Sequence, residues 1–147
     1  ARDYQGVAVG GVIVDFSKEY RQGEPRDVLL VKTRTWGGRY TLVGGRVEEG
    51  EDLTASLERT VRKQTGLKAN VGDTVCAFRE LADSGFYRPR PRRAFVDSVV
   101  GVESRDIELD ETLLDYFWAS PEEAAKDSRI EDNARKTMGK YLENAVL

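Results

Sequence analysis

The segment from Leu42 to Leu67 contains the residues whose types and spacing could support chemistry. A glycine pair, Gly44 and Gly45, follows an apolar stretch, and three loop glutamates come next, namely Glu48, Glu49 and Glu51. Backbone N–H groups of a glycine pair near a helix start suit a phosphate, although the pair could equally form a simple turn. The loop carboxylates suit a hard cation such as Mg²⁺, or they form a solvated acidic loop.

The composition limits the available chemistry. The 147 residues include no His and a single Cys, which excludes His-based catalysis, an intramolecular disulfide and a cysteine-cluster metal site. Catalysis would therefore need carboxylates, Lys, Arg, Tyr or hydroxyl groups. No apolar run reaches the roughly 18 residues of a membrane span. The net charge of −3 gives no general attraction to nucleic acid. We expect one cytoplasmic domain over residues 1–147, without a nucleic-acid or membrane partner.

The elements that must position these residues can be predicted from the apolar pattern. We expect strands at residues 7–16, 27–33, 39–43, 71–81, 93–102 and 115–119. We expect helices at residues 52–65, 120–127 and 129–144. The last helix has an apolar face that should pack on the sheet, formed by Ile130, Ala134, Met138, Tyr141 and Leu142. This mixture of helices and strands predicts an α/β sandwich with a mixed sheet.

The segment resembles the Nudix box, which reads Gly, five residues, Glu, seven residues, then Arg-Glu-apolar-any-Glu-Glu-any-Gly-apolar. Gly45, Glu51 and Arg59 occupy its first Gly, first Glu and Arg. The later apolar, Gly and apolar positions follow without a gap, at Val61, Gly66 and Leu67. The flanking LVGGRVEEGE and DYFWASPEEA segments are similar to the opening strand and the closing strand and helix of the family. The resemblance implies a Nudix-type α/β/α sandwich acting on a nucleoside diphosphate linked to another group.

The three helical glutamates of the box are replaced here by Thr60, Lys63 and Gln64. In the family, helical carboxylates hold Mg²⁺ against the diphosphate while water attacks. Glu58 cannot replace them, since two residues along a helix correspond to a rotation of about 200°. Glu51 is retained as the candidate catalytic and metal-binding residue, so the resemblance implies at most weak Mg²⁺ binding. Further ligands could come from other loop carboxylates, namely Glu48, Glu49, Glu103, Glu108, Asp110 and Glu111.

A weaker similarity links the chain to the GDP-mannose mannosyl hydrolases, which cleave a sugar–phosphate C–O bond. Arg46 and Arg59 fall at the arginines that bind the diphosphate in that branch. The retained glutamate of the branch falls at Gln64, and its catalytic His falls near Leu113. The substrate-binding half of this pattern is thus partly present and the catalytic half is not.

Three functions stay open. The first is a protein that binds a nucleoside diphosphate derivative, nucleotide sugars included, with a degenerate metal site and weak or absent hydrolysis. The second is an active Mg²⁺-dependent hydrolase with a reduced carboxylate set around Glu51. The third is a non-catalytic regulatory or interaction module. The expected substrate-binding residues are Gly44, Gly45, Arg46, Arg59 and Lys63.

Several of these residues have a second interpretation. Arg59 could instead pair with Glu51 to brace the loop, and Lys63 could either replace metal charge or extend into solvent. We expect core or edge positions for Trp36, Tyr40 and Trp118 and a buried position for Cys76. The Arg88–Arg93 loop is either a stiff exposed connection or a lid over an anion. The resemblance also implies a homodimer.

Overall fold

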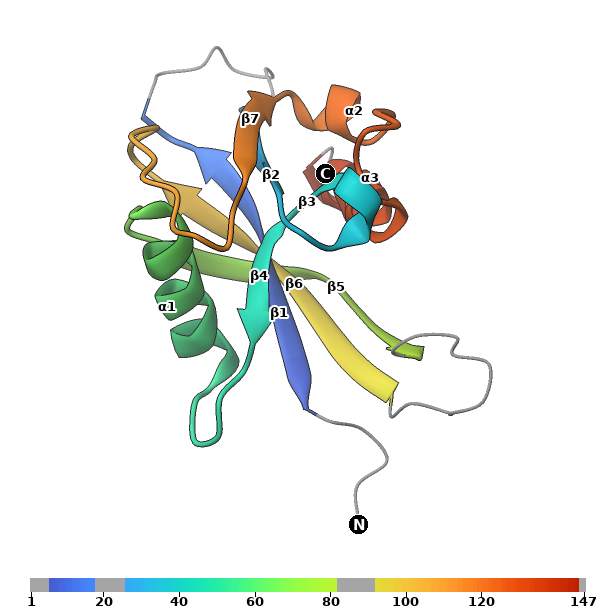
Figure 1. Cartoon of the computed structure of the whole chain (residues 1–147). Helices are drawn as coiled ribbons and strands as arrows, with labels where there is room; N and C mark the ends of the chain where they lie inside the picture. Colours follow the sequence, from blue (N-terminus) through green and yellow to red (C-terminus); the bar gives the residue numbers. More distant parts are fainter. Residues whose placement is uncertain (1–5, 18–25, 82–91, 146–147) are drawn as a thin grey trace.

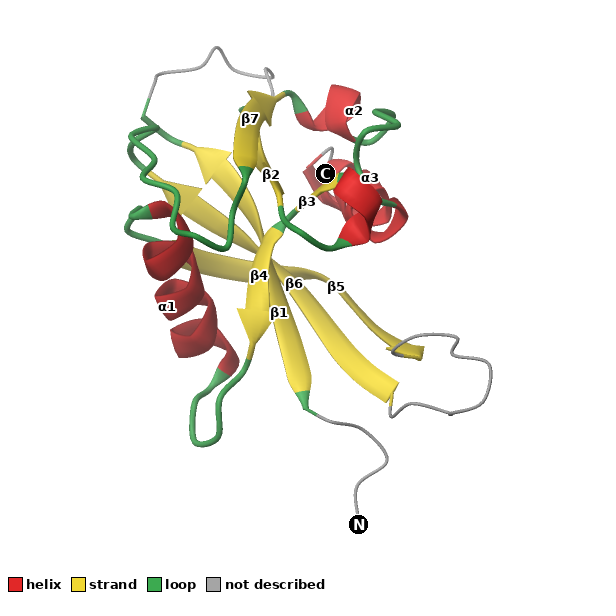
Figure 2. Ribbon diagram, viewed as in Figure 1, coloured by secondary structure: helices red, strands yellow, loops and turns green. Residues whose placement is uncertain are grey.

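A computed structural model describes residues 6–17, 26–81 and 92–145 of the chain. Within these residues, seven strands form one mixed sheet (Figures 1 and 2). The strands are β1 (Val7–Asp15), β2 (Val28–Lys32), β3 (Tyr40–Thr41), β4 (Val43–Arg46), β5 (Asn70–Leu81), β6 (Arg92–Val102) and β7 (Asp115–Ala119). The helical segments are η1 (Trp36–Gly38), α1 (Leu53–Thr65), α2 (Pro121–Ala124) and α3 (Asp132–Ala145). None of these helices is long and apolar enough to cross a bilayer.

Strand β1 lies at the centre of the sheet and pairs with three neighbours. It runs parallel to β6 along its whole length and antiparallel to β4 along its first half. Its end pairs antiparallel with β2, and β2 pairs antiparallel with β3 and with β7. Strand β5 pairs antiparallel with β6. The expected mixed sheet is therefore confirmed. This register places Asp97, Gly10 and Gly44 side by side on β6, β1 and β4.

Helix α1 covers one face of the sheet (Figure 1). It begins after Asp52, whose side chain accepts a hydrogen bond from Ala55 N at 2.7 Å, and it ends at Gly66 with a φ of 77°. Leu57 and Val61 are buried in a core that β1 shares, as the helical period predicts. Leu53, on the first turn of the same helix, is 42% exposed instead.

Helix α3 covers the opposite face and completes the sandwich (Figure 1). Three residues of its expected apolar face are buried with β1 and β2 in a second core, namely Ile130, Ala134 and Met138. Tyr141 packs against this core and is partly buried. The predicted packing of this helix on the sheet is confirmed.

Several local expectations are wrong. Gly44 and Gly45 lie inside β4 rather than in a turn. Position 44 requires a glycine because it lies so close to β1 that a Cβ would be 2.6 Å from the Val9 carbonyl oxygen. The single strand expected at residues 39–43 is divided into β3 and β4. Trp36 is exposed and Cys76 is only partly buried, since Cys76 lies on β5 at the edge of the sheet. Residues 88–91 of the arginine-rich loop lie outside the described residues.

Arg105, in the connection from β6 to β7, links three strands. Its Nε lies 2.5 Å from Asp15 Oδ2 at the end of β1, and its Nη2 lies 2.6 Å from Asp27 Oδ2 before β2. Its guanidinium lies 4.9 Å from the centre of the Trp118 ring on β7. Burial alone would raise the pKa of Asp15, but hydrogen bonds from Ser17, together with the hydrogen bond and charge of Arg105, lower it. The carboxylate is thus held as an anion inside the fold.

Replacing Arg105 with Ala should reduce the free energy of unfolding by about 3 kcal/mol, because it removes the guanidinium that pairs with the buried Asp15 carboxylate. Arg129→Ala is the matched control. Arg129 also pairs with an aspartate, Asp127, and stacks on a ring, that of Phe117, but its side chain is 62% exposed. The control should lose much less than the Arg105 variant, because solvent screens an exposed pair. Urea unfolding measures both variants, and equal losses would contradict the role assigned to Arg105.

Candidate functional site

Arg59 braces the acidic loop that precedes α1. Its Nε lies 2.7 Å from Glu51 Oε2 and its Nη2 lies 2.9 Å from Glu51 Oε1, which makes a bidentate pair. Nη2 also donates to the carbonyl of Arg46 at 3.2 Å. The loop itself adds a hydrogen bond from Glu48 N to Glu51 Oε1 at 3.1 Å. These are the contacts of the bracing role considered for Arg59.

Glu51 is a strongly stabilised anion. The hydrogen bonds from the Arg59 side chain and from the backbone N–H of Glu48 lower its pKa from 4.5 to about 2. Both carboxylate oxygens already accept hydrogen bonds from Arg59. Any cation that approached Glu51 would therefore meet the guanidinium charge beside it.

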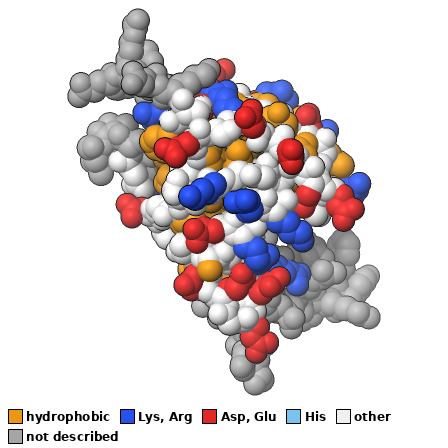
Figure 3. All heavy atoms as spheres, turned by 90° about the vertical axis from the view of Figure 1, so that its left-hand side faces the viewer, with side chains coloured by type: hydrophobic (Ala, Val, Ile, Leu, Met, Phe, Trp, Pro, Cys, Tyr) orange, Lys and Arg blue, Asp and Glu red, His pale blue; other side chains and the backbone are white. Residues whose placement is uncertain are grey.

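The three positions that carry helical glutamates in a Nudix box have different surroundings here. Thr60 is buried beneath β4, where a Cβ at Gly45 would lie 3.2 Å from it. Lys63 is exposed. Gln64 is partly buried, and its Nε2 donates to the carbonyl of Gly44 at 3.1 Å. Figure 3, which views the side of the molecule that carries α1, shows Lys and Arg side chains interspersed with Asp and Glu.

These side chains do not fit the metal centre that the resemblance implies. Mg²⁺ requires several oxygen ligands in near-octahedral geometry. Within residues 6–17, 26–81 and 92–145, no three His, Cys, Asp or Glu side chains are grouped so that they could hold a metal ion. The retained carboxylate, Glu51, is paired with Arg59. We therefore assign no chemical step to a metal at this box.

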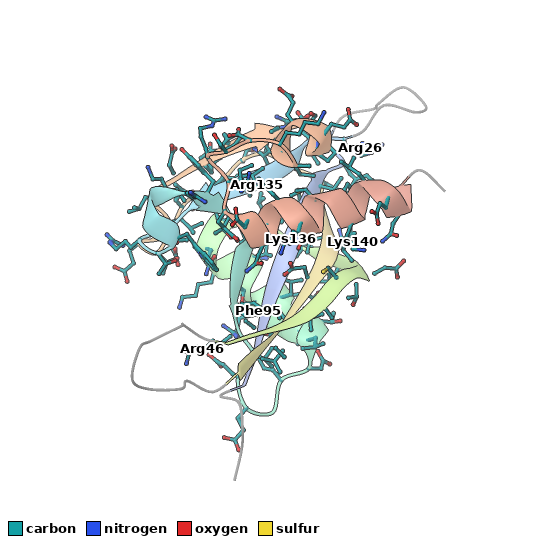
Figure 4. All side chains as sticks on the ribbon, turned by 90° about the vertical axis from the view of Figure 1, so that its right-hand side faces the viewer. Arg26, Arg46, Phe95, Arg135, Lys136 and Lys140 are labelled. Atoms are coloured by element: carbon teal, nitrogen blue, oxygen red, sulfur yellow. The ribbon has the colours of Figure 1, made fainter. Side chains whose placement is uncertain are left out.

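A pocket of about 440 Å³ lies on the side of the sheet that α3 covers. Phe95, which lines it, lies on the sheet below α3 in Figure 4. Its walls are formed by the backbone of β1 and β4, the end of α1, the segment before η1 and the start of α3. The residues that matter here are Gly10, Gly44, Gln64, Trp36, Asp97 and Glu131.

The pocket includes only part of the site expected from the sequence. Gly44 and Gly45 line it. Four other expected residues, Arg46, Glu51, Arg59 and Lys63, are not among its lining residues in the described part of the chain. Figure 4 shows Arg46 farther from α3 than Phe95 is.

Two nearly buried acids in the pocket wall were missed by the sequence analysis. Asp97 is 7% exposed and Glu131 is 6% exposed. Thr137 Oγ1 donates to Asp97 Oδ2 at 2.7 Å, and Thr41 Oγ1 donates to Glu131 Oε2 at 2.7 Å. Burial raises the pKa of Asp97, the Thr137 hydrogen bond lowers it, and the nearby charge of Glu131 raises it further, with a net increase. An aspartate inside the apolar strand FVDSVVGV was the available signal for Asp97.

Trp36 and Arg34, in the segment between β2 and β3, also line the pocket. Trp36 is 40% exposed and has a φ of 61°, a left-handed conformation that is unusual for a bulky residue. Arg34 Nη1 donates to the carbonyl of Glu111 at 2.9 Å, which fixes the side chain on the pocket wall. Strained backbone of this kind is concentrated at functional sites in proteins.

Glu51→Gln should lower the thermal stability near neutral pH, because it removes the anion that Arg59 holds. The folded pKa of about 2 lies below the ordinary value of 4.5, so this stabilisation is fully present above pH 4.5 and is lost as the pH falls toward 2. The difference in Tm between parent and variant should therefore shrink across that window. Glu49→Gln removes an exposed charge from the same loop and serves as the control. A parent-to-variant difference that stays constant down to about pH 2.5 would contradict this account.

Sequence comparison places this chain among proteins of one family. Residues 5–141 match the NUDIX domain family. The nucleoside triphosphatase NudI of Salmonella schwarzengrund is 30% identical over 93 residues, covering 60% of this chain and 66% of that protein. Putative nudix hydrolase 1 of Caenorhabditis elegans is 28% identical over 99 residues, covering 66% of this chain and 25% of that protein. The matches thus span less than two thirds of either relative's length.

Solved structures share the fold. The MutT protein from Methanosarcina mazei Go1 matches with a TM-score of 0.73 and 21% identity, covering 95% of this chain and 94% of that one. The NUDIX domain of Shewanella oneidensis NrtR complexed with ADP ribose matches with a TM-score of 0.73 and 16% identity, covering 96% and 88%. These likenesses confirm the Nudix-type α/β fold. Since the family match extends over residues 5–141, the chain belongs to the Nudix family.

Proposed function

We propose that this protein binds a nucleoside diphosphate linked to a further group, such as another phosphate or a sugar, and hydrolyses it weakly or not at all. The observation that carries the proposal is that the box keeps residues that line a pocket but lacks its metal-binding glutamates. Gly44, Gly45 and Gln64 line the pocket. The three helical glutamate positions hold Thr60, Lys63 and Gln64 instead. A Salmonella relative named a nucleoside triphosphatase and a Shewanella domain complexed with ADP ribose support a ligand of this class.

One cationic side chain in the pocket wall and two on residues next in sequence to its lining would neutralise the diphosphate. Arg34 lines the pocket, Arg46 follows the glycine pair on β4, and Lys63 precedes Gln64 on α1. Charge-assisted hydrogen bonds from such groups bind phosphate without a metal. They do not lower the pKa of a bound water as a metal does, so hydrolysis would stay slow.

The alternative is an active hydrolase that uses Mg²⁺ with a reduced carboxylate set around Glu51. The low pKa of Glu51 favours it, since the carboxylate stays ionised well below neutral pH. The bidentate contact with Arg59 opposes it, because a cationic group already occupies both oxygens. A non-catalytic regulatory or interaction module would use the same pocket and show binding without turnover.

Calorimetric titration with ADP-ribose and with GTP, in EDTA and in Mg²⁺, tests the proposal together with an assay of phosphate release. We expect binding in EDTA, a small gain in Mg²⁺, and turnover far below the roughly 1 to 10³ per second of ordinary enzymes. Failure of both ligands to bind in either buffer would contradict the proposed binding function. Turnover at an ordinary enzymatic rate in Mg²⁺ would instead establish the alternative.

Lys63→Ala should weaken the binding of ADP-ribose in EDTA by about fivefold, the effect of about 1 kcal/mol expected for one exposed charged contact. Arg62→Ala is the matched control. Arg62 is also exposed on α1 and occupies a box position that carries no metal ligand in the family. Affinity that is unchanged in the Lys63 variant would show that this side chain extends into solvent, and equal losses in both would show only a diffuse effect of charge.

A further inference from the structure

Two side chains of α1 donate hydrogen bonds to oxygen atoms on β4 and in the acidic loop. Gln64 Nε2 lies 3.1 Å from the carbonyl oxygen of Gly44. Arg59 Nη2 lies 3.2 Å from the carbonyl oxygen of Arg46, at the end of the same strand. Arg59 also donates to both carboxylate oxygens of Glu51, at 2.7 and 2.9 Å. The chain itself thus supplies a donor to each of these oxygens.

These oxygens are of the kinds that a hard cation binds. Carboxylate and backbone carbonyl oxygens are common protein ligands of Mg²⁺ and Ca²⁺. A metal ion and an N–H group both place positive charge against such an oxygen. Here the charged guanidinium of Arg59 faces the charged carboxylate of Glu51, and the neutral carboxamide of Gln64 faces the neutral carbonyl of Gly44. Each donor therefore matches its acceptor in charge.

The partner of Gln64 fixes the orientation of its side-chain amide. A carbonyl oxygen only accepts hydrogen bonds, so the nitrogen of the carboxamide must face Gly44. A glutamate at position 64 would instead place a second acceptor against that carbonyl. Two acceptors without a donor or a cation between them leave both groups unsatisfied. A glutamine can hold this contact without a metal, whereas a glutamate requires one.

A second replaced position of the box packs on the same glycine pair. Thr60 is 4% exposed, and a Cβ at Gly45 would lie 3.2 Å from its side chain. Gly44 is held equally closely on its other side, since a Cβ there would lie 2.6 Å from the carbonyl oxygen of Val9. Strand β4 therefore lies closely packed between β1 and α1, which are its neighbours in Figure 1. Gly44, Gly45 and Gln64 also line the pocket.

We propose that Arg59, Thr60 and Gln64 form a metal-free clamp that holds β4, and with it the glycine wall of the pocket, against α1. The fixed donors of Arg59 and Gln64 take the place of the cation that a Nudix box with helical glutamates would bind. Gln64 is a positioning residue in this clamp, since it acts through the Gly44 carbonyl. The inference rests on the proposed function only in that the glycine wall contacts the ligand.

Thermal unfolding without nucleotide tests the clamp, in EDTA and in increasing concentrations of Mg²⁺. The parent should have the same Tm in both buffers, because its box oxygens already accept hydrogen bonds. Gln64→Met keeps a side chain of similar length but removes the donor. Its Tm should fall by about 2 to 4 °C, the shift expected when a domain of this size loses one hydrogen bond. Mg²⁺ should not restore the Tm of this variant.

Gln64→Glu separates a metal-free clamp from ordinary packing. In EDTA its Tm should fall at least as far as that of Gln64→Met, because the carboxylate faces the Gly44 carbonyl. Mg²⁺ should then raise the Tm as its concentration rises, since a cation can bind both oxygens. Asn144→Asp makes the same change of charge at an exposed position of α3, and it should respond to Mg²⁺ as the parent does.

Three results would overturn the clamp. These are a Tm of Gln64→Met equal to that of the parent, an equal rise of Tm with Mg²⁺ in the parent and in Gln64→Glu, and no rise in Gln64→Glu. If Gln64→Glu does not fold in either buffer, the Tm of Gln64→Met decides the question.

Amide hydrogen exchange tests the positioning role of Gln64 apart from overall stability. In Gln64→Met, the amides of β4 should exchange about fivefold faster than in the parent, while those of β6 should be unchanged. Equal acceleration in both strands would show a general loss of stability and would contradict the positioning role. Failure of the parent to bind ADP-ribose would overturn the proposed function, and it would leave these measurements on the free protein unaffected.

Discussion

The close approach of bare backbone across β6, β1 and β4 is the constraint on which the site depends. Asp97, Gly10 and Gly44 are register partners on these three strands. A Cβ at Gly10 would overlap the Asp97 carboxylate, and one at Gly44 would lie 2.6 Å from the Val9 carbonyl oxygen. Only Asp97 can therefore place a side chain along this line. Both glycines line the pocket, so bare backbone forms this part of its wall.

Strand β4 lies between α1 and the pocket, and only Gly45 and Gln64 of the Nudix box line that pocket among the described residues. Gly44 and Gly45 both line the pocket, and a Cβ at Gly45 would also contact Thr60 of α1. The hydrogen bond from Gln64 to the Gly44 carbonyl joins the two regions at the edge of β4. Because strands rather than helical carboxylates build the pocket, the loss of box glutamates leaves its walls in place. Ligand binding and metal-assisted hydrolysis are thus physically separable in this fold.

The sequence predicts the parts of this structure that follow from local rules. The helix with its Asp52 cap and Gly66 terminus, the apolar face of α3 and the mixed sheet all correspond to periodicity and capping. The pocket depends on register, which no local pattern encodes. Asp97 is a single acid in an apolar strand, and its importance appears only when β1 places Gly10 beside it. Trp36 was expected at a core or edge position, but it lies in a loop with a left-handed backbone conformation that leaves it 40% exposed.

The central claim is that the ligand binds in the pocket on the α3 side without the metal set of the box. An ¹⁵N NMR titration of the protein with GTP in EDTA tests it most directly. The account predicts saturable shifts of the Gly10, Gly44 and Gly45 amides and of the Trp36 indole, with small changes around Glu51. Shifts confined to residues 48–51 and the exposed side of α1, with the pocket glycines unmoved, would contradict it.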